Sequence, residues 1–179
     1  MRRIIEATLL SLDGVMGEPH VWASDYFDDE SRNAALEQLL ASDAMLMGRR
    51  TYEVFSKIWP GEDGDYADRL NDMPKYVFSS TLNYAEWSNA TILRGDVATE
   101  ARSLKEQPGR DLIVYGHGRL ARTLLRHQLL DELRIFVHPL VVGHGALLFQ
   151  EGEHARLTLT ATHATPAGVA VLIYEPTAP

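Results

Sequence analysis

The chain has 179 residues, of which 45% are hydrophobic and 23% charged, with a formal net charge of −8 and no cysteine. This length and composition predict one domain of the ordinary soluble globular class. The negative charge argues against a general nucleic-acid binder, which needs a basic face to neutralise phosphates. The absence of cysteine excludes disulfides, thiolate nucleophiles and thiolate metal sites, and it fits a cytoplasmic protein.

Neither a membrane span nor a targeting segment is expected. No apolar run approaches the roughly 18 residues that crossing a bilayer requires. Two arginines follow Met1, but no long apolar region comes before Glu6, so the N-terminus lacks the pattern of a signal peptide. No repeat or linker divides the chain, and residues 1–179 are expected to form a single domain.

Apolar runs alternate with helical patterns along the first half of the chain. In chain order, the expected elements are a strand over 4–12, a loop over 14–24, a helix capped by Ser24 or Asp25, a strand over 44–47, a helix over 49–58 and a mobile acidic loop over 61–72. The second half predicts strands over 75–79 and 91–93, a helix over 97–106, a strand over 111–115, a helix over 119–127, a strand over 133–142 and a hairpin of 157–162 with 169–175.

This alternation predicts an α/β fold with a mixed, mostly parallel sheet that helices flank on both faces. The last two strands have no helix between them, so they are expected to form an antiparallel C-terminal hairpin. In such folds ligands bind beyond the carboxyl ends of the parallel strands. Three clusters of small or polar residues follow predicted strands and are expected to share that edge: Gly48-Arg49-Arg50-Thr51, Ser79-Ser80-Thr81 and Gly116-His117-Gly118-Arg119-Leu120.

The first cluster has the features of an anion site. A helix N-terminus carries unpaired N–H groups and partial positive charge, which favour a bound anion. Cations such as Arg49 and Arg50 are disfavoured at that end of a helix, so a phosphate would explain their placement. A basic, solvated turn after a buried strand is the alternative, and local sequence does not choose between them.

The third cluster matches the G-x-G-x-x-G/A pattern of dinucleotide-binding folds, with Ala121 in the last position. That interpretation requires an acidic residue near the end of the next strand to hold the ribose. The next predicted strand instead contains Val137-His138-Pro139 and no carboxylate. A tight strand-to-helix turn accounts for the two glycines equally well.

Together the three clusters resemble the dihydrofolate reductase superfamily, and more closely its branch that contains the reductase domain of riboflavin biosynthesis. The matching segments are Met47-Gly48-Arg49-Arg50-Thr51-Tyr52, Val77-Phe78-Ser79-Ser80-Thr81 and Tyr115-Gly116-His117-Gly118-Arg119-Leu120. Ser11-Leu12-Asp13-Gly14, Leu129-Leu130-Asp131-Glu132-Leu133 and the run from His138 to Gly145 are similar to the riboflavin-type branch. The resemblance covers nearly the whole chain and implies a single-domain dihydrofolate-reductase-like fold.

The resemblance implies NADPH as cofactor and hydride transfer to a small heterocyclic, carbonyl or imine substrate of pterin or aminopyrimidine type. Arg49 would meet the 2′-phosphate, with Ser80 and Arg119 as partners, while Arg50 and Thr51 would contact the pyrophosphate. The implied cofactor-binding residues are Gly48, Arg49, Arg50, Thr51, Ser79, Ser80, Gly116, His117, Gly118, Arg119 and Leu120. His117 departs from the family's glycine, and its Cβ is expected to crowd the nicotinamide.

A substrate would lie between the loop after the first strand and the first helix, with Gly14, Trp22, Tyr26 and Tyr52 as pocket residues. Asp13, by match to the riboflavin-type motif, and Asp28, on the first helix, are the candidate catalytic carboxylates. Asp25, Asp29 and Glu30 lie in the same region, and no spacing selects among them. The alternatives are a turn-forming role for Asp13 and complementation of the helix dipole by the others.

Other functions are weighed against this one. The histidines show no metal-ligand spacing, so no metal is expected. True dihydrofolate reductase activity is disfavoured because the N-terminal loop is similar to the riboflavin-type branch. A catalytically silent NADP-binding or interaction domain with the same fold stays open. Relatives commonly pair and long C-terminal strands offer an edge, so a homodimer is expected.

Overall fold

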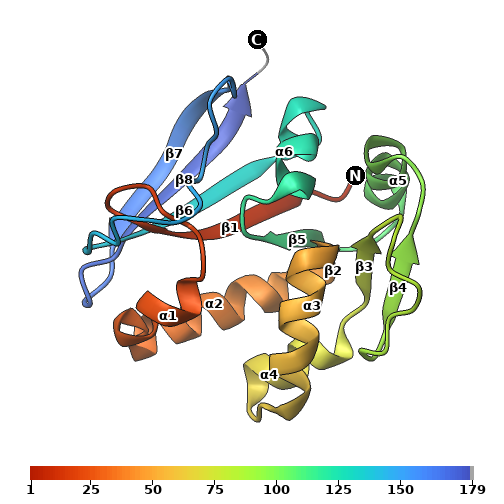
Figure 1. The fold of residues 1–179 in the computed structure, drawn as a ribbon, viewed down its shortest axis with the longest axis horizontal. Coiled ribbons are helices and arrows are strands. Elements are labelled where there is room, and N and C mark those ends of the chain that lie inside the picture. Colours follow the sequence, from red (N-terminus) through yellow and green to blue (C-terminus); the bar gives the residue numbers. More distant parts are fainter. Residues whose placement is uncertain (178–179) are drawn as a thin grey trace.

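A single eight-stranded sheet, with strand order β4-β3-β2-β5-β1-β6-β8-β7, organises residues 1–177, the part of the chain that the computed structural model describes (Figure 1). The strands are β1 (Ile4–Ser11), β2 (Ser42–Gly48), β3 (Lys75–Phe78), β4 (Ala90–Leu93), β5 (Asp111–Tyr115), β6 (Glu132–His138), β7 (Arg156–Ala164) and β8 (Ala170–Thr177). The helices are α1 (Pro19–Trp22), α2 (Asp29–Ala41), α3 (Arg49–Ile58), α4 (Asp65–Asp72), α5 (Val97–Glu106) and α6 (Arg119–Arg126), with 3-10 turns η1 (Ser24–Tyr26) and η2 (Trp59–Gly61).

The sheet is mixed, as the sequence predicts. Strands β1 to β6 pair in parallel, whereas β8 is antiparallel to both β6 and β7. The α/β class and the antiparallel C-terminal hairpin are therefore confirmed. Parallel strands need crossover connections, and the helices that supply them cover both faces of the sheet.

Helices α5 and α6 lie on one face of the sheet, and α1 to α4 lie on the other (Figure 1). Each face has its own core: the α6 side packs Leu124 against strand residues such as Val114, and the α3 side packs Met47 and Ile113 around Leu70. The central strands β2 and β5 are buried on both faces, which explains their continuous apolar sequences. Within residues 1–177, no helix is long and apolar enough to cross a membrane.

Three local expectations are wrong. The acidic segment predicted as a mobile loop forms α4, because Ala67 and Leu70 share an apolar face that is buried against the core while the acidic residues face solvent. The first long helix is capped by Asp28, since Ser24 and Asp25 belong to the separate turn η1. Strand β6 ends at His138 and not at residue 142, because the next residue, Pro139, has no N–H to continue the ladder.

Lys75 fixes the end of α4 to the start of β3. Its side chain is fully buried, and Nζ donates hydrogen bonds to the carbonyl oxygens of Asn71 at 2.8 Å, Met73 at 2.8 Å and Ser88 at 3.0 Å. The ammonium also lies 4.4 Å from the ring centre of Trp87. Burial lowers the pKa of Lys75 to about 8, which still leaves the amine protonated at neutral pH.

We expect Lys75→Met to lower the free energy of unfolding by about 1–3 kcal/mol, because three carbonyl groups lose their buried donor. Lys57→Met is the matched control, since Lys57 is exposed on α3 and should change stability by less than about 0.5 kcal/mol. Urea unfolding of both variants measures the difference. Equal effects of the two substitutions would contradict the role given to Lys75.

Candidate functional site

Helices α3 and α6 begin next to each other at the carboxyl edge of the sheet. Their N-caps are Gly48 and Gly118, and neither has a side chain that caps the helix N-terminus. A Cβ built on Gly48 would lie 4.0 Å from the Cβ of Leu120, in the first turn of α6. Since α3 and α6 lie on opposite faces of the sheet (Figure 1), adjacent β2 and β5 flank a switch point, where α/β folds bind ligands.

The first turns of these two helices carry cations instead of the usual carboxylates. Helices α2 and α5 are capped by Asp28 and Asp96, and both have acidic residues in the first turn. Helices α3 and α6 have no acidic residue there, and Arg49, Arg50 and Arg119 are exposed. Unpaired N–H groups, two helix dipoles and three guanidinium groups therefore favour an anion at this edge.

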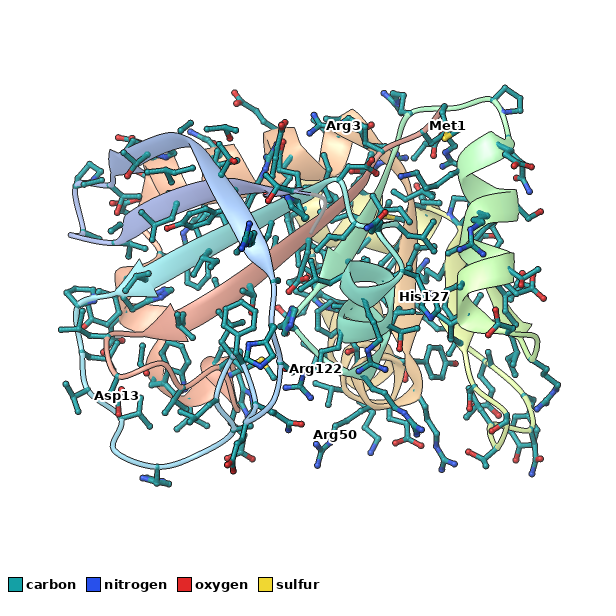
Figure 2. The ribbon with its side chains drawn as sticks, turned by 90° about the horizontal axis from the view of Figure 1, so that it is seen from above. Met1, Arg3, Asp13, Arg50, Arg122 and His127 are labelled. Atoms are coloured by element: carbon teal, nitrogen blue, oxygen red, sulfur yellow. The ribbon has the colours of Figure 1, made fainter. Side chains whose placement is uncertain are left out.

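Figure 2 shows Arg50 pointing away from the sheet on the side where β1 ends near Asp13, with Met1 and Arg3 at the opposite edge. Arg49 instead lies along the protein surface. Its Nε donates to Glu53 Oε1 at 2.6 Å, and its Nη1 donates to Thr81 Oγ1 at 2.8 Å. The side chains of the two arginines, although adjacent in the sequence, therefore point in different directions.

A small open cavity of about 240 Å³ adjoins Arg49 and is lined by Thr81, Leu82, Asn83 and Tyr84. Ser79 shapes this segment, because its Oγ accepts hydrogen bonds from the N–H groups of Thr81 at 3.3 Å and Leu82 at 3.0 Å. Of the residues after β3, Thr81 is the one in contact with the Arg49 guanidinium. The sequence did not single out the cavity, because the loop that follows the Ser-Ser pair forms it. Glu53 was also missed, although its i,i+4 spacing from Arg49 on α3 is a local signal for the pair.

The turn between β5 and α6 is open on its outer side. Gly116 has φ +76°, a conformation that favours glycine, and a Cβ built on Gly116 or Gly118 would meet no atom within 4 Å. His117 is fully buried between them, and its Nδ1 lies 2.8 and 3.0 Å from the two carboxylate oxygens of Glu6. The imidazole therefore lies beneath the turn, which corrects the expectation that this residue crowds the ligand side.

Asp13 joins the end of β1 to the loop that follows β6. Its carboxylate accepts hydrogen bonds from Ser11 Oγ at 2.6 Å, Val142 N at 3.1 Å and Gly143 N at 2.7 Å. These bonds, led by that from Ser11, lower the pKa of Asp13 to about 2. The group is ionised at neutral pH and clamps two loops together, while its catalytic assignment stays a prediction.

Asp28 is likewise occupied by main-chain amides. Its Oδ1 accepts from Ser31 N at 2.8 Å, which caps α2, and its Oδ2 accepts from Ala167 N at 3.0 Å in the β7–β8 turn. The hydrogen bonds from Ser31 are the main cause of the lowered pKa of Asp28. The capping alternative accounts for this geometry, and a catalytic role for Asp28 also stays a prediction.

The expected pocket residues do not come together. Tyr52 is a core residue with 5% exposure, and its hydroxyl accepts a hydrogen bond from Trp87 N at 3.2 Å, so its assignment to the pocket is wrong. Gly14 lines an open depression of about 370 Å³ with Leu147 and Leu148. Trp22 and Tyr26 do meet, but around a residue that the pocket assignment did not include.

That residue is His138, at the end of β6. The rings of Trp22 and Tyr26 stand edge-on to its imidazole, with ring centres 5.4 and 5.5 Å away. Its Nδ1 lies 2.9 Å from the carbonyl oxygen of Phe136 and 3.3 Å from that of Leu10, so this nitrogen carries the proton. Burial lowers the pKa of His138, which keeps the ring neutral at physiological pH. The His-Pro pair after an apolar strand is the only local signal for it.

A second group missed from the sequence lies at the end of β5. The hydroxyl of Tyr66 donates to that of Tyr115 at 2.9 Å, and the ring of Phe55 lies against Tyr115 with centres 5.9 Å apart. Burial raises the pKa of both tyrosines, so both hydroxyls stay protonated. Tyr115 directly precedes Gly116, which places this aromatic cluster beside the open turn. Over residues 1–177, no group of three or more acidic, histidine or cysteine side chains could hold a metal ion.

Comparison with known proteins gives a consistent family. The sequence profile of the family described as RibD C-terminal domain matches residues 2–172. The chain is 30% identical over 180 residues to the uncharacterized protein YyaP of Bacillus subtilis, covering 97% of this chain and 95% of that protein. It is 25% identical over 156 residues to YwjB of the same organism, covering 84% of each.

Solved structures show the same fold. A putative riboflavin biosynthesis protein from Shewanella sp. PV-4 matches with a TM-score of 0.77 and 19% identity over 98% of this chain and 99% of that chain. A pyrimidine reductase-like protein from Corynebacterium diphtheriae matches with a TM-score of 0.69 and 12% identity, covering 99% and 93%. A Thermotoga maritima diaminohydroxyphosphoribosylaminopyrimidine deaminase/5-amino-6-(5-phosphoribosylamino)uracil reductase matches with 0.69 and 15%, covering 98% of this chain and 57% of that one.

The Asp13 clamp should have a defined acid limit. Its pKa in the folded protein is about 2, below the unfolded value of about 3.9, so its stabilisation is present above about pH 4 and lost as the pH falls toward 2. We expect Asp13→Asn to lower the urea midpoint by a constant amount from pH 7 to 5, and this deficit should shrink below pH 4. Asp63→Asn, at an exposed loop position, is the control. A deficit that persists undiminished to pH 2 would rule out the clamp.

Proposed function

Because the chain belongs to the RibD C-terminal domain family, whose profile matches residues 2–172, we propose that it is an NADPH-dependent reductase of the pyrimidine type. It transfers a hydride to a small heterocyclic, carbonyl or imine substrate, in the class of pterins and aminopyrimidines. The observation that carries the proposal is the pair of adjacent, uncapped helix starts at Gly48 and Gly118. The pyrimidine reductase-like structural neighbour supports the substrate class.

The residues at this edge fit a phosphorylated dinucleotide. The N–H groups of the first turn of α3, together with Arg50 and Thr51, bind the pyrophosphate. Gly116 and Gly118 leave the space that the ligand needs, since no atom lies where a side chain would stand. When bound, the cofactor supplies the hydride, and the protein positions the reactants and excludes water.

Arg49 and Thr81 supply the recognition of the 2′-phosphate. The guanidinium and the hydroxyl are already held 2.8 Å apart beside the small cavity, so both can turn to one phosphate group. A planar guanidinium binds phosphate in a bidentate manner that lysine does not reproduce. Leu82 and Tyr84, which line the same cavity, would contact the adenine end of the cofactor.

The second candidate function is an NADP-binding or interaction domain without turnover. One observation favours it: both candidate catalytic carboxylates, Asp13 and Asp28, already accept hydrogen bonds from main-chain amides. If the chain is a reductase, its substrate therefore needs a proton source other than these two carboxylates. The neutral side chains of Tyr115 and His138 lie at the same edge of the sheet, at the ends of β5 and β6.

Mixing the purified protein with NADPH and a panel of pterins and aminopyrimidines tests the proposal, with cofactor oxidation followed by absorbance. A reductase oxidises NADPH only when a suitable substrate is present. Tight NADPH binding with no oxidation by any substrate would favour the silent binding domain. No NADPH binding at all would overturn both.

We expect Arg49→Ala to weaken NADPH binding roughly 10- to 100-fold, because hydrogen bonds to a charged group contribute about 1.5–3 kcal/mol. Binding of NADH, which lacks the 2′-phosphate, should change little. Titration calorimetry with both cofactors gives the ratio, and Arg102→Ala on the exposed side of α5 serves as the control. An unchanged preference for NADPH would remove Arg49 from the phosphate site.

A homodimer is also proposed. On the face that carries α5 and α6, no helix of residues 1–177 lies over β6 and β8 (Figure 1). The depression there is mostly apolar, and Leu147, Phe149 and Leu159 are 52%, 38% and 48% exposed. An exposed apolar patch of this kind favours association with a second copy.

The net charge of −8 and the lack of cysteine support a cytoplasmic protein with small-molecule and not nucleic-acid ligands.

Substitution of a charge into this face should dissociate the dimer. We expect Leu147→Glu to shift the protein to the monomer mass in sedimentation velocity, because an unpaired charge would be buried in the contact. Val54→Glu, on α3, places the same charge on a different exposed residue and should leave the mass unchanged. A wild-type protein that sediments as a monomer at all concentrations would refute the proposed pairing.

A further inference from the structure

Glu6 and His117 form an ion-pair geometry in the interior that the proposed chemistry does not use. Both side chains have 0% exposure, and Nδ1 of the imidazole lies 2.8 Å from Oε1 and 3.0 Å from Oε2 of the carboxylate. One nitrogen of the ring is thus shared between the two carboxylate oxygens, at ordinary hydrogen-bond distances. Each side chain is the sole hydrogen-bonding partner of the other among residues 1–177.

The apolar surroundings of this pair make its burial unfavourable for the stability of the fold. Glu6 lies on the central strand β1, between Val114 of β5 and Leu133 of β6, which are both buried apolar residues. The imidazole meets the ring of Phe149 edge-on, with ring centres 5.1 Å apart. Nε2 of His117 is buried without a hydrogen-bond partner among the described residues. Burial of polar groups with incomplete pairing lowers stability, so packing alone does not account for them.

The position of the pair in the chain suggests what it is for. His117 stands between Gly116 and Gly118, the two residues whose outer sides are open, and Gly118 is the N-cap of α6. The glycines give the turn conformational freedom, which must be restricted if its N–H groups are to point in one direction. Two contacts restrict it, and both reach β1: Gly116 N donates to the carbonyl oxygen of Ala7 at 2.9 Å, and His117 holds Glu6.

We propose that Glu6 and His117 are positioning residues for the cofactor's pyrophosphate. The pair ties the turn to the central strand from beneath, so that the N-terminus of α6 faces the ligand with its N–H groups already aligned. This inference rests on the proposed NADP site and adds to it a determinant that lies outside the surface of contact. A preorganised turn binds more tightly because less conformational entropy is lost on binding.

The two ends of the ligand allow a direct test. NADP⁺ contains the pyrophosphate, whereas adenosine 2′-monophosphate lacks it and keeps the 2′-phosphate that Arg49 and Thr81 recognise. Glu6→Gln keeps the volume and one hydrogen bond but loses the charge, and the double substitution Glu6→Leu with His117→Leu removes both polar groups together, which preserves folding when both partners are replaced. Titration calorimetry measures both ligands on each variant.

We expect both variants to bind NADP⁺ at least fivefold more weakly than wild type and adenosine 2′-monophosphate within twofold of wild type. Glu132→Gln is the control, because Glu132 is also a buried, ion-paired carboxylate but lies at the opposite end of the neighbouring strand β6. It should leave both affinities unchanged.

The other outcomes separate this inference from the proposed function. If the variants bind both ligands as wild type does, the positioning role is wrong and the NADP site stands. If they lose both ligands equally, the pair holds the whole edge of the sheet, and a specific effect on the pyrophosphate is likewise excluded. If the wild-type protein binds neither ligand, the proposed function fails and the positioning role fails with it.

Discussion

The parallel pairing of β2, β5 and β1 is the constraint on which the rest of the structure depends. Because these strands run in the same direction side by side, the segments that follow them leave the sheet at one edge. Helices α3 and α6 then turn to opposite faces, and their N-termini lie close together. The arginines, the open glycine turn and the small cavity beside Arg49 all occupy places that this pairing creates.

Much of this arrangement could be predicted from the sequence because its signals are local. The bounds of α3, α5 and β5 follow from apolar runs that end at glycine, proline or aspartate, and the clusters after the strands share an edge once the strands are parallel. Helix α4 could not be recognised in the same way, since its acidic composition resembles a solvated loop. Only the burial of Ala67 and Leu70 against the core distinguishes the two.

The finer parts of the site depend on contacts between distant segments, which periodicity and propensity do not report. Asp28 stands before a helix as a capping residue would, yet its second bond reaches a turn 139 residues away. Nothing in the sequence around Tyr52 marks it as a core residue, and only its contact with Trp87 in the folded chain does so. The inward orientation of His117 follows from Glu6, 111 residues earlier, whose buried carboxylate has no sequence signature.

The contrast between the capped and uncapped helices has a consequence for stability. Helices α2 and α5 carry their own N-caps in Asp28 and Asp96, whereas α3 and α6 have no side-chain cap, and the proposed anion would take that role. A ligand that binds only the folded chain stabilises it in proportion to the logarithm of its concentration. Binding of the proposed cofactor at this place would therefore link the folding equilibrium of the protein to the cofactor concentration, and the ligand-free chain would be less stable than the bound one.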